Sequence, residues 1–369
     1  MDLMNRQDRR ALNRSRPIYR PRRPSYMLTR QREMRHCDVI FPHTILIGMG
    51  YPRSHTVIAG EPGFYHCHSR CVRRSWLCGN DPVTGKNFDH RRTWIEQRLL
   101  DLANSFAVAL YAWAVMDNHC HVILAVDPRL PRQWSDEDVA SRWSRLCASH
   151  RKGFPDPESR SRQQREAELL GNPERLETIR QRLGCVSWFN RYLKEAIARE
   201  ANAEDGCSGH FWDSRFGCQV LLDERAILTC MAYVDLNPIR AGAAISLADS
   251  RFTSIQHRLE ALGENAIDPD EQLGPVAGSA GIPGPEITLR SYIELVDWTG
   301  RQHREGKRGA IDSDSPHVLA RLRAPPDTWV TLTTNLFSYF RVAVGSRSRL
   351  NTFARRLSRS RIRGMRVAW

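Results

Sequence analysis

Two apolar segments separated by only two residues constrain the fold more than any other feature of this sequence. Residues 106–116 and 119–126 are almost entirely apolar, and Asp117-Asn118 lies between them. Asp and Asn favour the tight turns that join neighbouring strands. Two strands joined by so short a turn must pair antiparallel. The sequence therefore predicts an antiparallel β-hairpin.

Strands and helices are predicted on both sides of this hairpin. A strand at 63–73 alternates, placing Tyr65, Cys67, Ser69 and Cys71 on one face and His66, His68 and Arg70 on the other. Residues 211–221 also have the composition of a strand. Helical spacing or capping residues predict helices at 89–105, from 135, at 172–183, at 186–202 and at 223–237. Residues 151–170 are polar and are expected to lack regular structure.

Composition divides the chain into four parts. Residues 1–57 form a basic arm that is expected to be largely disordered, and residues 58–260 form the main domain. Residues 261–290 are rich in Gly, Pro and Asp, which predicts a linker. Residues 291–369 are expected to be helical and to end in an Arg-rich tail.

The charge of this chain is concentrated at its ends. The net charge is +14, of which residues 1–36 contribute +8 and residues 341–369 contribute +9, the latter without any acid. A preference for Arg codons would account for only four of the 55 basic residues being Lys, but it does not account for the absence of acids at residues 341–369. The Arg side chain presents a planar fork that fits phosphate, so the expected partner is a nucleic acid.

Several classes of protein are disfavoured. No apolar segment approaches the roughly 20 residues that cross a bilayer. The Arg-rich start lacks the apolar segment of a secretory signal, although a mitochondrial presequence is a less favoured alternative. The ten cysteines form no Cys-x-x-Cys pair, which favours reduced thiols in the cytoplasm over a zinc ribbon or a disulfide scaffold.

His119 and His121 lie two residues apart at the start of the second hairpin strand. Alternate residues of a strand share a face, so these imidazoles project together, about 7 Å apart along the chain. Such a pair can bind one divalent cation, although surface or core histidines have the same spacing. Cys120 is expected to face the opposite, buried side.

Tyr233 and Asn237 are four residues apart and share one helix face, just before Pro238. The tyrosine could act as a nucleophile and the amide oxygen as a metal ligand. A half-buried tyrosine and a helix-ending asparagine would give the same pattern. Tyr192 is a rival nucleophile, but Ala196 four residues later offers no ligand atom.

Together these motifs resemble the REP-associated tyrosine transposases of the HUH single-strand transposase and nuclease superfamily. The resemblance covers about 63–255, and residues 114–121 and 233–242 are its specific parts. Supporting parts are residues 65–66, 70–74 and 211–216. The resemblance implies an α+β fold: an antiparallel sheet with flanking helices (a ferredoxin-like HUH core), here with a helical C-terminal region and basic tails.

The resemblance also implies site residues. His119, His121 and Asn237 would bind Mg²⁺ or Mn²⁺, and Tyr233 would be the catalytic nucleophile. This sequence departs from the pattern of the family at two points. Cys120 replaces a residue that is usually bulky and hydrophobic, and about a hundred C-terminal residues exceed the minimal catalytic domain.

The function so implied is cleavage and rejoining of single-stranded DNA through a 5′-phosphotyrosine intermediate, on hairpins or palindromic repeats. Many proteins of this chemistry act as dimers, so a homodimer is compatible with it. The arginines expected to contact DNA are Arg73, Arg74, Arg191 and Arg215.

Three alternatives remain open at this point. The chain could be a domesticated hairpin-binding protein without turnover, or a metal-dependent phosphoesterase in which water attacks. A three-acid metal site is compatible with the many Asp and Glu residues, although none stands in a strand context like that of the histidines.

Overall fold

The computed structural model describes residues 52–72, 77–81, 84–148, 158–304, 315–360 and 362. All of them belong to the compact unit Ile47–Trp369. Most of the basic arm at 1–57, Arg73, Arg74 and nearly all of the tail beyond residue 360 lie outside the described residues. Among the helices of the described part, none is both long and apolar enough to cross a membrane.

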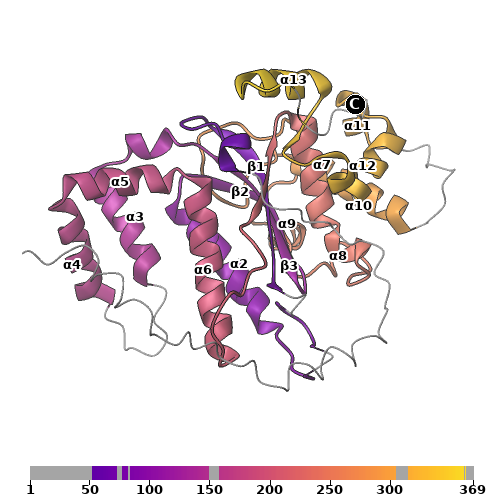
Figure 1. The fold of residues 1–369 in the computed structure, drawn as a ribbon. Coiled ribbons are helices and arrows are strands. Elements are labelled where there is room, and N and C mark those ends of the chain that lie inside the picture. The colour runs from indigo at the N-terminus through magenta and orange to yellow at the C-terminus, as the bar shows by residue number, and fades with distance from the viewer. Residues whose placement is uncertain are drawn as a thin grey trace, which may run out of the picture. The chain divides into compact units, whose positions relative to one another are not determined.

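A six-stranded sheet forms the centre of the molecule (Figure 1). Its strands, in sheet order, are β5 (Ala277–Gly278), β2 (Val108–Val115), β3 (His119–Val126), β1 (Gly63–Arg70), β4 (Gly217–Leu221) and β6 (Ala343–Val344). All neighbouring strands pair antiparallel except β4 and β6, which are parallel. The predicted hairpin is confirmed as β2 and β3, and β3 is a central strand.

The order of elements around β1 to β4 is that of a ferredoxin-like fold. The chain runs β1–α2–β2–β3–α6–β4, with several helices between β3 and α6, and the four strands lie in the order β2-β3-β1-β4. Helices α2 (His90–Ser105) and α6 (Val186–Glu204) pack against each other. The Asn190 amide of α6 reaches the Cys67 thiol at 3.4 Å, so α6 covers the sheet face to which Cys67 points. The expected α+β class is confirmed.

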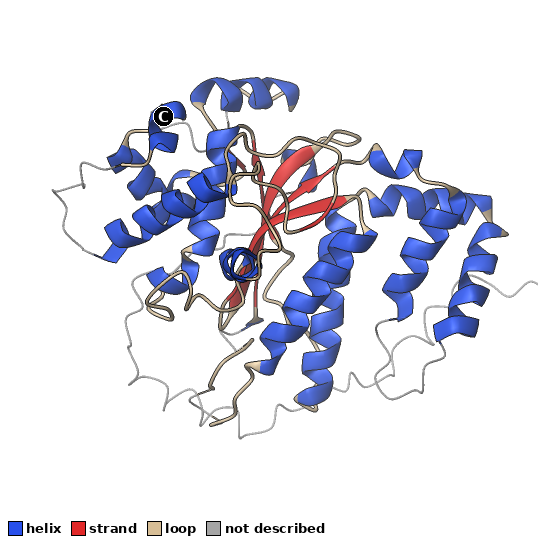
Figure 2. Cartoon of the chain, turned by 180° about the vertical axis from the view of Figure 1, so that it is seen from behind, coloured by secondary structure: helices blue, strands red, loops and turns tan. Residues whose placement is uncertain are grey.

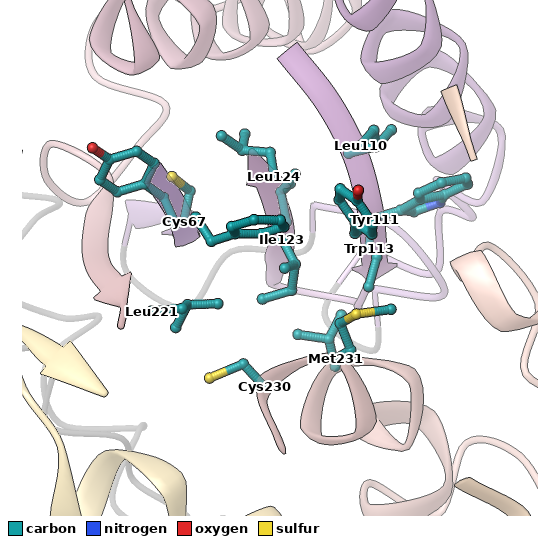
Figure 3. Close-up of a cluster of buried hydrophobic side chains, with 14 of the residues drawn as sticks. Cys67, Leu110, Tyr111, Trp113, Ile123, Leu124, Leu221, Cys230 and Met231 are labelled. Atoms are coloured by element: carbon teal, nitrogen blue, oxygen red, sulfur yellow. The ribbon is translucent and has the colours of Figure 1, made fainter. Parts of the chain in front are cut away.

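The opposite sheet face is covered by α7 (Glu224–Asp235), which packs on β2, β3 and β4. Figure 3 shows Cys230 and Met231 of α7 facing Ile123 and Leu221 of the sheet. Helices α10 (Leu289–Arg304) and α12 (Pro326–Tyr339) pack in turn on α7. The sheet is thus enclosed between helices on both faces, as Figure 2 also shows.

Nine further helices complete the described part. They are η2 (Arg53–His55), η4 (Leu130–Gln133), α3 (Asp136–Ala148), α4 (Glu158–Leu170), α5 (Pro173–Leu183), α8 (Asn237–Arg240), α9 (Ser254–Gly263), α11 (His317–Arg321) and α13 (Arg347–Arg356). Three expected helix starts are confirmed by side-chain caps. Ser135, Asn172 and Asp223 each accept a hydrogen bond from the backbone N–H three residues later.

Three local predictions are wrong. Part of the segment 151–170 is helical, because α4 packs on α3 and an Arg162–Glu166 pair at 2.9 Å supports it. The strand expected at 211–221 begins only at Gly217, since Trp212 makes a single isolated bridge with Cys71. The expected linker at 261–290 contains β5, which pairs with the edge of β2.

Gly278 explains why a Gly-rich segment that resembles a linker belongs to the sheet. Its φ is +76°, and a Cβ there would lie 2.1 Å from the Val108 carbonyl oxygen. Only glycine therefore allows this segment to approach β2. Leu273, Ala280 and Ile287 on either side are buried, so the segment belongs to the body of the fold.

Candidate functional site

Two His-Cys-His sequences lie side by side at the centre of the sheet. Residues 66–68 belong to β1 and residues 119–121 to β3, and His68 is paired with His121 in the antiparallel register. Directly paired and alternate residues share a face, so the four imidazoles project to the side of α7. Cys67 and Cys120 point to the opposite side and are buried, as predicted for Cys120.

The four imidazoles contact one another. His66 Nε2 and His121 Nδ1 are 2.9 Å apart, a hydrogen-bonding distance. The rings of His119 and His121 meet edge to face with centroids 5.0 Å apart, and the His68 ring lies 5.8 Å from His121. His68 fits only because residue 217 is glycine, where a Cβ would lie 2.1 Å from His68 Nε2.

Tyr233 approaches this histidine cluster from α7. Its ring centroid is 5.7 Å from that of His121 and 6.1 Å from that of His66. Asp223 caps α7 at its start, and the helix ends at Asp235 as the following proline predicts. Tyr233 lies just inside this end and is 4% exposed. The structure therefore brings the predicted nucleophile to His121, one of the two predicted histidines.

Asn237 opens the short helix α8, directly after α7, and is buried. Its Nδ2 atom is buried without a hydrogen-bond partner, and so is Nε2 of His121. Two unsatisfied polar atoms of this kind are costly in a protein interior unless a ligand or water satisfies them. His121 Nε2 can bind a cation through its lone pair, whereas Asn237 Nδ2 is an N–H donor, so a metal ligand from Asn237 would be its amide oxygen.

The chemistry of the donors fits a divalent cation with two imidazole ligands. His119 Nδ1 is 2.7 Å from the Asn118 amide oxygen, which can only accept, so Nδ1 carries the proton and Nε2 the lone pair. Burial, with help from Arg70 and Arg240, lowers the pKa of His119 to about 3, and burial also holds the pKa of His121 well below its usual range. Neutral imidazole is the form that binds metals.

Carboxylates and thiols do not complete such a site. Within the described residues, no group of three or more His, Cys, Asp or Glu side chains is arranged to hold a metal ion. The amide oxygen of Asn237 stays the predicted third protein ligand.

Sequence reasoning missed His66 and His68 as members of the cluster. The signal was present, because His66-Cys67-His68 repeats the spacing of His119-Cys120-His121. Burial lowers the pKa of His66 to about 4, while the hydrogen bond with Gln219 opposes that shift. Gln219 was also missed, since only the pairing of β1 with β4 places it opposite His66.

Phe337 of α12 closes the cluster on the side of the C-terminal region. Its ring centroid lies 4.9 Å from His68, 5.4 Å from His66 and 5.7 Å from Tyr233. No local sequence pattern identifies this residue. The C-terminal region that exceeds the expected catalytic domain thus contributes directly to the site.

Arg240 places a positive charge beside Tyr233. Its guanidinium carbon lies 3.8 Å from the centroid of the Tyr233 ring, and Nη2 donates to the Tyr233 carbonyl oxygen at 3.1 Å. Nη1 donates to the carbonyl oxygens of Thr333 and Thr334. The same arginine therefore joins α7 to α12 next to the proposed nucleophile.

The other predicted residues lie elsewhere. Arg191 is exposed on α6, with its guanidinium 4.8 Å from the Trp188 ring and its Nε 3.5 Å from Glu195. Tyr192 packs against Trp143 on the same helix layer, on the sheet face away from the histidines. This placement removes Tyr192 as a rival nucleophile at the histidine cluster.

Arg215 is exposed in the bend before β4 rather than within a strand. The indole N–H of the nearby Trp212 donates to the Lys194 carbonyl oxygen, and the Lys194 ammonium lies 5.3 Å from the Trp212 ring. Arg73 and Arg74 lie outside the described residues.

Comparison with known proteins gives one structural likeness. No protein-family model and no curated protein matches the chain. A solved structure of a REP-associated tyrosine transposase bound to a REP hairpin is similar, with a TM-score of 0.33 and 15% identity. The match covers 65% of this chain and 97% of that one. A likeness this distant does not transfer a function.

Proposed function

We propose that this protein cleaves and rejoins single-stranded DNA, as a DNA transposase does, with Tyr233 as its nucleophile. The observation that carries the proposal is the contact between the Tyr233 ring and His121, the histidine whose buried Nε2 has no hydrogen-bond partner. A tyrosine beside the neutral imidazoles of His66 and His121, which project from two central strands, is an arrangement suited to phosphoryl transfer.

The proposed step conserves phosphodiester bonds. The Tyr233 phenol loses its proton and its oxygen attacks the phosphorus. A Tyr–O–P bond forms at the 5′ phosphate while the bond between phosphorus and the 3′ oxygen breaks. The departing 3′ oxygen takes up a proton from solvent and becomes a 3′-OH, which balances the proton that the phenol releases. A second 3′-OH can attack the phosphotyrosine and release Tyr233, which joins two strands without ATP.

His119 and His121, through Nε2, and the Asn237 amide oxygen are the residues that would hold Mg²⁺ or Mn²⁺. When bound, such a cation stabilises negative charge on the scissile phosphate. Tyrosine has an ordinary pKa near 10 and is a weak nucleophile at neutral pH, so the step needs help of this kind. Arg240 adds a fixed positive charge, with its guanidinium carbon 3.8 Å from the centroid of the phenol ring.

Nucleic acid is the substrate class that the charge favours. The chain has a pI near 9.7, and residues 1–36 and 341–369 together carry a net charge of +17, whereas the residues between them sum to −3. Arg191 beside Trp188 combines a cation and an aromatic face, which suits a stacked base and its phosphate. We propose a single-stranded hairpin as the substrate, with Arg73, Arg74, Arg191 and Arg215 among its contacts.

The test is formation of a covalent adduct. Purified full-length protein is incubated with labelled hairpin DNA and Mn²⁺, and the products are resolved on a denaturing gel. The expected result is a protein–DNA adduct that is lost in Tyr233→Phe and His119→Ala. The matched control is Tyr192→Phe, which changes a tyrosine of the opposite sheet face and should leave the adduct intact.

Two other outcomes would replace the proposal. Cleavage without an adduct that survives Tyr233→Phe would identify a phosphoesterase in which water attacks. Tight hairpin binding without cleavage in any divalent metal would identify a DNA-hairpin-binding protein without turnover.

A further inference from the structure

A continuous chain of buried hydrogen bonds runs from the C-terminal region to the proposed metal ligand. Gln219 Nε2 donates to the Phe340 carbonyl oxygen at 3.0 Å. Gln219 Oε1 lies 2.9 Å from His66 Nδ1, and His66 Nε2 lies 2.9 Å from His121 Nδ1. All four residues are at most 1% exposed. The chain ends at His121 Nε2, which is buried without a hydrogen-bond partner.

The direction of every bond in this chain follows from its first member. A carbonyl oxygen can only accept, so Gln219 must present its amide N–H to Phe340 and its oxygen to His66. His66 Nδ1 is therefore the donor. An imidazolium at this depth would be an uncompensated buried charge, so His66 is neutral and its Nε2 accepts. His121 must then donate from Nδ1, which leaves the lone pair on Nε2.

We propose that Gln219 and His66 are positioning residues that hold His121 in the Nδ1–H form and so present its Nε2 lone pair to the divalent cation. This inference rests on the metal site of the proposed function. Asn118 does the same for His119 by accepting from its Nδ1. Groups that fix the tautomer and orientation of a ligating histidine commonly contribute 10- to 100-fold to metal affinity.

The C-terminal region would thereby orient the histidine that binds the metal. Phe340 follows α12 directly and precedes β6, and its backbone carbonyl sets the direction of the whole chain of bonds. The backbone of this region, rather than a side chain, thus determines which nitrogen of His121 is free.

The first measurement is made on metal-free, full-length protein with ¹⁵N-labelled histidine. Two-bond ¹H–¹⁵N correlations distinguish the nitrogen that carries the proton from the one with the lone pair. The expected result is Nδ1–H for His66, His119 and His121, whereas exposed His317 should show the Nε2–H form that free imidazole side chains prefer in water. Nε2–H at His121 would overturn the inference.

The second measurement is Mn²⁺ affinity, followed by the paramagnetic resonance of the free ion. His66→Leu removes the acceptor for His121 and should weaken Mn²⁺ binding about 10- to 100-fold. His66→Gln keeps an amide oxygen where Nε2 lies and should stay within about threefold of the wild type. His317→Leu is the control and should leave affinity unchanged. Equal affinity of His66→Leu and the wild type would overturn the inference.

Gln219→Met provides a second test of the inference if His66→Leu does not fold. It removes both hydrogen bonds at similar volume and should also free His66 to change its tautomer, with weaker Mn²⁺ binding. The proposed function fails separately: expected tautomers and affinities without a Tyr233 adduct would leave the positioning role intact and exclude the transposase reaction. An adduct that forms equally well in His66→Leu and in the wild type would support the transposase reaction and exclude the positioning role of His66.

Discussion

The ring of Phe337 lies 5.7 Å from the ring of Tyr233 and nearly perpendicular to it, although the two residues are 104 positions apart in the sequence. Helix α12 is interrupted at Asn335, where φ is −122° and ψ is 34°, two residues before Phe337. The interruption separates the last residues of α12 from the regular helix that packs on α7. Phe337 and Arg240 together cover the phenol ring of the proposed nucleophile.

Removing the Phe337 ring should expose the site. We expect Phe337→Ala to raise the rate of adduct formation severalfold, because a phosphate can then approach Tyr233 without displacing an aromatic ring. The lost contacts should cost about 2 kcal/mol of the free energy of unfolding, less than for a fully buried phenylalanine. Single-turnover adduct assays and urea denaturation measure the two effects. Phe337→Leu is the control, and an unchanged or slower rate in Phe337→Ala would show that the ring does not restrict access.

The histidine cluster should make the metal-free protein sensitive to acid. Burial lowers the pKa of His66 to about 4, whereas an unfolded histidine titrates near 6.5. Between these values the unfolded chain binds a proton that the folded chain does not, so stability falls as pH decreases. The free energy of unfolding is unaffected by titration of His66 above pH 6.5. It decreases as the pH falls to about 4, and the total loss from this residue is roughly 3 kcal/mol.

Urea denaturation at pH 7 and at pH 4.5, in the presence of a chelator, measures this loss. The variant His66→Gln lacks the titrating group and should lose less stability over the same pH interval. A wild-type protein equally stable at both pH values would contradict the neutral, buried state of the cluster.

Gly217 should tolerate no side chain. A Cβ at this position would lie 2.1 Å from two atoms of the His68 ring, so Gly217→Ala must displace the imidazole. Overpacking of this kind costs about 1–3 kcal/mol. Gly263→Ala is the matched control, since nothing lies within 4 Å of its Cβ position and alanine favours the helix it ends. Thermal denaturation should show a lower midpoint for the first variant only.

Asp235 should be the most sensitive position of α7 to a conservative change. Its carboxylate accepts hydrogen bonds from the Ser254 hydroxyl, the Ile255 N–H and the Tyr292 hydroxyl, and so ties α7 to α9 and α10. Asp235→Asn turns one acceptor into a donor that faces these donors, which should cost about 2–3 kcal/mol. Tyr292→Phe removes one partner only and should cost less. Chemical denaturation of the two variants tests this order.

Local sequence signals predicted the parts of the fold that depend on local interactions. The hairpin of β2 and β3 follows from two apolar segments and a short turn, and Asn172 and Asp223 begin their helices as expected. The placement of His119 and His121 on one face follows from alternation alone. These features need only a few neighbouring residues, so one sequence suffices to find them.

The rest of the site depends on contacts that no local pattern encodes. His66 became part of the cluster through the register of β1 with β3, and Gln219 through that of β1 with β4. Phe337 reaches the histidines only because α12 packs on α7. The Gly- and Pro-rich composition of 261–290 also concealed β5, because close approach to Val108 requires glycine there.

Strand β6, which pairs with β4, comes late in the sequence, and this determines when the site can be completed during synthesis. Synthesis proceeds from the N-terminus, and domains fold as their segments emerge from the ribosome. A nascent chain that has reached residue 300 already contains the four histidines and Tyr233, but it lacks Phe337, the Phe340 carbonyl and β6. The site is thus complete only after residues 337–344 have been synthesised, and a product terminated before residue 337 carries an open version that lacks the Phe337 ring and the Phe340 carbonyl.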